Sequence, residues 1–163
     1  MKGVLALVIS VAAAGLLLVA PAWAEEPTRD QYREQVEPIC QANTESNKRI
    51  LKNARERAKS RVPAKMKEAG AQFIHASAVF GKTVEKLAAV PRPAADDERL
   101  LKWFKQLGIV QTNLRKLGKA LKATEEIKAA HEQIRVERAS NAANNFSFVF
   151  NFHYCHLTPS RFF

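Results

Sequence analysis

The sequence predicts an all-α protein, an up-down bundle of about four helices with an extended aromatic segment at its C-terminus. Apolar residues recur at helical spacing through residues 64–145, and Pro63, Pro91 and Pro93 separate the periodic stretches. After residue 145 the spacing of apolar residues changes to two, which indicates extended chain.

The predicted first helix runs from Thr28 to Val62. Thr28 and Gln31 have the spacing of a capping box at its start. Pro38 lies inside this stretch and is expected to kink or restart the helix, because proline removes one backbone hydrogen bond. A second helix is predicted over residues 64–89, with a core-facing stripe of Met66, Ala69, Phe73, Ala76, Phe80, Val84 and Leu87.

The predicted third helix, over residues 94–123, has the strongest periodicity. Its apolar residues follow 3-4 spacing over three heptads: Leu100, Trp103, Leu107, Val110, Leu114, Leu117 and Leu121. This spacing is typical of the inner seam of an antiparallel bundle; the alternative is a zipper that forms a homodimer or binds another protein. The fourth helix is expected to begin at a Thr124 cap and to continue through Ile127, Ala130 and Ile134 towards Asn145.

Alternating aromatic residues follow the fourth helix. Phe146, Phe148, Phe150, Phe152 and Tyr154 share one face of an extended segment. We expect this face to lie on the bundle, because an exposed aromatic edge promotes aggregation.

Residues 1–24 have the pattern of a cleavable signal peptide, which leaves residues 25–163 as a single helical domain. Lys2 precedes an apolar stretch, and Ala22-Trp23-Ala24 places small residues at a cleavage site. We expect cleavage after Ala24 and a secreted or cell-envelope location. The alternative is an uncleaved membrane anchor.

Two cysteines, Cys40 and Cys155, are the only ones in the chain. In an oxidising compartment we expect them to form a disulfide, whose sequence separation of 115 residues corresponds to about 4–5 kcal/mol in the chain-entropy model. Free or intermolecular thiols are the alternative.

The formal net charge is +10. This charge favours anionic wall polymers or membrane head groups as partners, whereas nucleic acid is not expected. The alternative is an ordinary solvated surface. The densest basic run, and the predicted anionic-surface site, is Lys48, Arg49, Lys52, Arg55, Arg57, Lys59 and Arg61.

Catalytic motifs are absent from the sequence: it contains no G-x-S-x-G, H-E-x-x-H, C-x-x-C or glycine-rich phosphate loop. No catalytic residue and no cofactor is therefore expected. His153, Cys155 and His156 could supply metal ligands, but their spacing lacks that of defined sites and the disulfide would use the thiol, so no metal is expected.

Asparagines form two groups with four-residue spacing, one on each of the first and fourth helices: Asn43 and Asn47, and Asn141, Asn144 and Asn145. We expect a polar layer between the two helices that fixes their register. The alternative is a ligand pocket lined by amides.

These segments also carry a resemblance. Val36 to Cys40 with its nearby asparagines, Val90 to Ala94, and the aromatic stretch ending at Cys155 are similar to exported helical proteins of unknown function from high-GC Gram-positive bacteria. The resemblance implies a helical body, paired terminal cysteines and an envelope or extracellular location, and it supplies no catalytic residue.

The sequence thus leads to an exported, non-enzymatic binding or structural protein with a basic surface. A protein-interaction or dimerisation module that uses the third helix is the alternative.

Overall fold

The computed structural model describes residues 26–159, so the predicted signal peptide lies outside the described residues. The described chain is helical, which confirms the predicted all-α bundle. Its α-helices are α1 (Arg29–Ile50), α2 (Ala54–Lys59), α3 (Pro63–Ala88), α4 (Asp97–Lys122) and α5 (Glu126–Ser147), and its 3-10 helices are η1 (Ala94–Asp96) and η2 (Phe148–Phe150).

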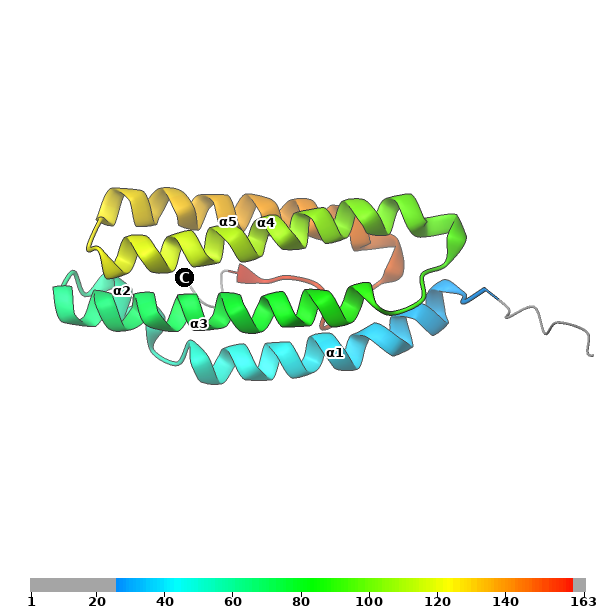
Figure 1. Cartoon of the computed structure of the whole chain (residues 1–163), viewed down its shortest axis with the longest axis horizontal. Helices are drawn as coiled ribbons and strands as arrows, with labels where there is room; N and C mark the ends of the chain where they lie inside the picture. Colours follow the sequence, from blue (N-terminus) through cyan, green and yellow to red (C-terminus); the bar gives the residue numbers. More distant parts are fainter. Residues whose placement is uncertain (1–25, 160–163) are drawn as a thin grey trace, which may run out of the picture.

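The four long helices run alternately up and down (Figure 1). α4 and α5 lie together along one side of the molecule, and α3 and α1 lie along the other. Residues 151–159, here called the C-terminal segment, turn back from the end of α5 and run along the bundle between these two pairs. The segment thus packs against the bundle, with Phe152 and Cys155 buried and Asn151, His153 and His156 exposed.

α1 begins as predicted and ends earlier than predicted. Thr28 and Gln31 form the capping box. Pro38 lies within a continuous helix, so the predicted restart does not occur. The chain leaves the helix after Ile50, and Asn53 adopts a left-handed conformation with φ 60° before the short helix α2. The single helix predicted up to Val62 is therefore two helices.

α3 and α4 approach each other closely at two glycines. The apolar stripes predicted for both helices face inwards: all of their members are buried except Val84 and Leu114, which are partly buried. A Cβ atom built on Gly70 would lie 2.5 Å from the carbonyl oxygen of Gly118, and one built on Gly118 would lie 2.7 Å from that of Gly70. Only glycine allows this approach. The heptad face of the predicted third helix is used within the chain.

α5 buries a different face from the one its large apolar residues indicate. Ala129, Val136 and Ala143 are buried, whereas Ile127 is 78% exposed and Ile134 is 45% exposed. Thr124 has φ 56°, and its hydroxyl donates to the carbonyl of Ala123. Thr124 therefore does not cap this helix as predicted, and the N-cap residue is Glu125.

The helical region continues past the predicted change to extended chain. α5 reaches Ser147, and η2 follows, so the turn into the C-terminal segment occurs at Asn151, which has φ 50°. As a result Phe148 points away from the core and is 83% exposed. The prediction of one apolar face from Phe146 to Tyr154 is wrong at Phe148 and holds for the buried Phe150 and Phe152.

Candidate functional site

The C-terminal segment is covalently attached to α1. Cys40 and Cys155 form a disulfide with a Cα–Cα distance of 5.0 Å, and both residues are buried. This is the pairing predicted from the sequence. It rules out the alternative of free thiols in this structure and leaves no Cys155 thiolate to join His153 and His156 as a metal ligand.

A carboxylate on α1 holds the same part of the segment. The backbone amide of His153 donates to Glu37 Oε1 at 2.6 Å, and that of Tyr154 donates to Glu37 Oε2 at 2.7 Å. Two successive amides thus share one carboxylate. Hydrogen bonds to a charged acceptor are stronger than neutral ones, so Glu37 fixes the register of the segment on α1.

An amide on α5 holds the other side of the segment. Asn144 Nδ2 donates to the carbonyl oxygen of Leu157 at 2.8 Å, and the amide of Leu157 donates to Asn144 Oδ1 at 2.8 Å. The side-chain amide of Asn144 therefore makes two hydrogen bonds to the backbone of Leu157, as a residue of a neighbouring β-strand would. Because Glu37 and Asn144 hold the segment from different helices, the segment connects α1 to α5.

Aromatic packing fixes the beginning of this region. Phe150 lies against Tyr32 with ring centroids 5.7 Å apart, and it stacks on Phe152 at 5.3 Å. Phe152 in turn contacts Trp103 at 5.3 Å. Rings in this range attract one another beyond their burial. The cluster closes one end of the space between the helices.

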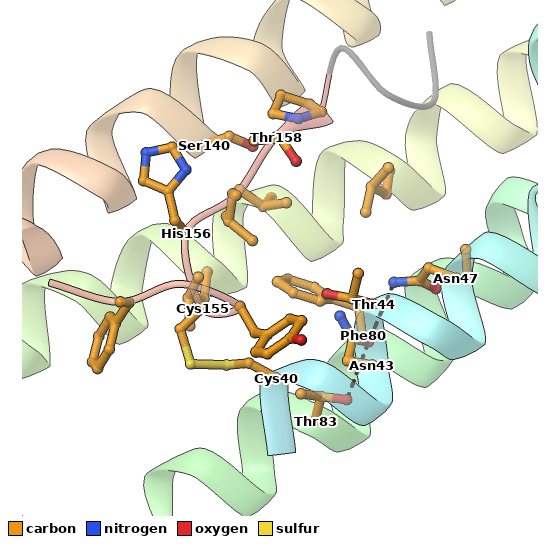
Figure 2. Close-up of a pocket in the computed structure, with 18 of the residues that line it drawn as sticks. Cys40, Asn43, Thr44, Asn47, Phe80, Thr83, Ser140, Cys155, His156 and Thr158 are labelled. Carbon is orange, nitrogen blue, oxygen red and sulfur yellow. Dashed lines mark hydrogen bonds between the residues drawn. A yellow bond between two sulfur atoms is a disulfide. The ribbon is translucent and has the colours of Figure 1, made fainter. Parts of the chain in front are cut away.

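A cavity of about 570 Å³ lies beside this cluster. All four long helices and the C-terminal segment contribute to its wall, as Figure 2 shows for the disulfide, Asn43, Asn47, Phe80 and Ser140. Its inner wall is mainly apolar, and its buried members include Ala76, Phe80, Leu87, Trp103, Leu107, Val110 and Val136. The rim is polar, with Lys48, His153 and His156 exposed and Thr44 and Thr158 partly exposed.

Two residues that border the cavity each carry a buried polar atom with no hydrogen-bond partner in the described part of the chain. These atoms are Nε1 of Trp103, a residue with no exposed surface, and Oδ1 of Asn47, which is 8% exposed. Leaving such an atom unpaired costs about 1–3 kcal/mol. Neighbouring atoms shield both of these atoms from solvent, so the cavity itself combines an apolar inner wall with a polar rim.

The structure does not bring the two predicted asparagine groups together. Asn47 Nδ2 donates to Asn43 Oδ1, which also accepts a hydrogen bond from the hydroxyl of Thr83, and both asparagines border the large cavity. Asn141, Asn144 and Asn145 instead border a separate cavity of about 460 Å³ beside the end of the segment. The C-terminal segment occupies the space where the register layer was expected.

The predicted basic run spans the end of α1, the following turn, α2 and the turn after it. Arg57 pairs with Glu68 at 3.0 Å, and Arg61 lies 3.6 Å from Glu126. The other five cations have exposed side chains and no ion pair within the described residues: Lys48, Arg49, Lys52, Arg55 and Lys59. Of the whole run, only Lys48 borders the large cavity.

Sequence reasoning did not find Glu37 or the cavity. No local sequence pattern indicates the role of Glu37, because its partners are backbone amides 116 and 117 positions away. The inner wall is made of residues predicted as ordinary core, and only Asn43 and Asn47, with the alternative of a pocket lined by amides, indicated a space there.

No family model, curated protein or solved structure that was compared with the chain matches it. Among the described residues, no helix has the length and apolar character that a membrane span requires.

Proposed function

We propose that this protein is an exported, non-enzymatic binding protein that holds a small apolar molecule inside its helical bundle. The observation that carries the proposal is the cavity of about 570 Å³, whose wall includes residues of every long helix. Its volume lies within the range of about 300–1,000 Å³ that is typical of small-molecule sites.

The wall supports this proposal through its composition. Its buried members include apolar side chains from α3, α4 and α5, which suit dispersion contacts with an apolar ligand. The disulfide, together with the signal-peptide pattern of residues 1–24 and the resemblance to exported proteins, supports a location outside the cytoplasm.

Calorimetric titration of the full chain with 1-dodecanol tests the proposal. We expect saturable binding of one molecule per chain and a higher melting temperature in its presence. Ala76→Leu places a larger side chain on the buried wall and should abolish binding, whereas Ala130→Leu changes an exposed alanine of α5 and should not. Absence of binding in the parent, or equal binding in Ala76→Leu, would contradict the proposal.

A second candidate function is adsorption to anionic wall polymers or lipid head groups. Five exposed cations without ion pairs among the described residues, gathered at the end of α1, in the following turn and on α2, favour it. Reversing charge at Arg55 and Lys59 should weaken adsorption to anionic vesicles or wall polymer at low salt. The same change at Lys105 and Lys116, exposed on α4, is the matched control. Adsorption by the parent should decrease as salt is raised through about 0.15 M; equal loss in both variants would remove the site from α2.

A further inference from the structure

α5 exposes a row of mainly apolar side chains on the side opposite its buried face. Ile127, Ile134, Asn141 and Phe148 recur every seven positions, and Phe148 directly follows the last residue of α5. Residues with this spacing lie along one side of a helix, and these four are here called the α5 stripe. All four are exposed, Ile127 and Phe148 by more than three quarters. Such a row of large exposed apolar side chains is typical of a surface that binds another protein.

The charge of α5 favours a second copy of this chain as the partner. α5 contains three acidic and three basic residues, whereas α4 contains two acidic and seven basic residues. In a protein with a formal net charge of +10, two copies that meet through strongly basic surfaces repel each other. α5 lies along one edge of the bundle (Figure 1), and its exposed face brings no net charge to a contact between copies.

The α5 stripe is complementary to itself in an antiparallel arrangement. A two-fold axis midway between positions 137 and 138 places Ile127 beside Phe148 of the second copy, because both lie equally far from the axis. It also places Ile134 beside Asn141 of the second copy. A single polar residue in an apolar seam fixes the register of two helices at a cost in stability, and Asn141 has this position.

The charged residues beside the axis favour the same arrangement. Glu137 and Arg138 follow Ile134 by three and four positions, so they flank the α5 stripe on its two sides. The axis places Glu137 of each copy beside Arg138 of the other, which gives two ion pairs. Within residues 26–159 neither side chain forms an ion pair, and Glu137 accepts one hydrogen bond, from Gln133. A parallel arrangement would instead bring each Arg138 towards its own copy, which repels it.

We infer that this protein forms a homodimer through α5, in which two antiparallel α5 stripes face each other across a two-fold axis. The interface is separate from the large cavity, which Val136 and Ser140 border from the buried face of α5. The inference therefore does not depend on the proposed function. It also differs from the zipper predicted for the third helix, whose heptad face is used within the chain.

Sedimentation equilibrium of the full chain at several concentrations tests the interface. We expect a reversible equilibrium of monomer and dimer. Ile134→Glu places a charge in the α5 stripe of each copy and should raise the dissociation constant of the dimer at least about tenfold. Leu101→Glu on α4, where the parent side chain is 51% exposed, is the matched control and should leave the constant unchanged. A parent that stays monomeric, or equal weakening by both variants, would overturn the inference.

Exchange of the two charges beside the axis tests the register. Arg138→Glu brings two carboxylates together at each end of the pair and should weaken the dimer about tenfold at low salt. Because this variant also lowers the net positive charge, general repulsion between copies predicts the opposite change. The double variant Glu137→Arg/Arg138→Glu keeps the net charge and should return the dissociation constant to within about threefold of the parent value. A double variant that dimerises as weakly as Arg138→Glu would overturn the inference.

Discussion

The two sides of this bundle are joined in different ways. At the α3–α4 interface the helices touch backbone to backbone, and Gly70 and Gly118 leave no room for a side chain. Between α1 and α5 the gap holds an extended segment, which Glu37, Asn144 and a disulfide attach to both helices. The α3–α4 interface depends on close backbone packing, whereas α1 and α5 are joined by the hydrogen bonds and the disulfide of the C-terminal segment.

The difference explains where the cavity lies. Helices in close contact leave no space between them, whereas a segment of extended chain is thinner than a helix and does not fill the volume that it spans. The space that remains beside it is the cavity next to Asn47 and Trp103.

The disulfide should give the largest effect. Cys155→Ser is expected to lower the free energy of unfolding by about 4 kcal/mol, since the bond closes a loop of more than 100 residues. It should also increase binding of a hydrophobic dye by loosening the cover over Phe150 and Phe152. Chemical denaturation measures the first effect and dye fluorescence the second. The double variant Cys40→Ser/Cys155→Ser should behave as the single variant does. If the variants are as stable as the parent and bind no more dye, the segment is held in place without the disulfide.

The glycine contact should give the next largest effect. Gly118→Ala is expected to destabilise the protein by about 1–3 kcal/mol, because the added methyl group would overlap the backbone of α3. Gly108→Ala on the same helix meets nothing within 4 Å and should stabilise it by up to about 1 kcal/mol. Thermal unfolding of both variants measures the difference. Similar melting temperatures for the two variants would contradict this expectation, because α3 and α4 could then move apart to admit the methyl group with little loss of stability.

Replacing the Glu37 carboxylate should lower the free energy of unfolding by less than the glycine substitution does. Glu37→Gln keeps the shape but removes the charge from two hydrogen bonds, and a loss of about 1–2 kcal/mol is expected. Hydrogen exchange at the amides of His153 and Tyr154 should become faster. Glu34→Gln, an exposed neighbour on α1, is the control and should change neither quantity. Unaltered exchange in Glu37→Gln would assign the position of the segment to the disulfide alone.

The smallest effect at neutral pH concerns Tyr32. Burial raises the pKa of its hydroxyl far above the ordinary value, although nearby Arg92 opposes this shift. An unfolded tyrosine ionises near pH 10, while the folded one stays protonated there. Stability should therefore decrease as pH rises above about 10, and Tyr32→Phe should show a smaller decrease. Urea unfolding between about pH 8 and 11 compares the two proteins; parallel curves would contradict the expectation.

The sequence identified the parts of the fold that depend on local pattern. The stripes of α3 and α4 are visible because large apolar residues recur on a single face of each helix. α5 carries two stripes with seven-residue spacing, one with Ile127 and Ile134 and one with Ala129 and Val136. Hydrophobicity favours the first, whereas close helix packing selects the second, with its smaller side chains. The sequence pattern of one helix cannot show whether hydrophobicity or close packing determines which face is buried.

The site was less predictable because its contacts are distant in sequence. Alternation of Phe146, Phe148 and Phe150 indicates a strand, but the preceding helix simply continues through the first of these residues. Asn144 lies on the predicted helix, but its expected partners were the asparagines of the first helix, since nothing in the local pattern indicates that it pairs with the backbone of Leu157. The disulfide was predictable because only one pair of cysteines exists.

The separation of 115 residues between Cys40 and Cys155 also orders the events of folding. Neighbouring helices can associate through contacts that are close in sequence, and such contacts form early. The C-terminal segment needs α1 and α5 already in place, because it bonds to both. The last wall of the cavity is thus added at the final step, and a molecule present at that moment can be enclosed during folding, before it would have to pass the rim.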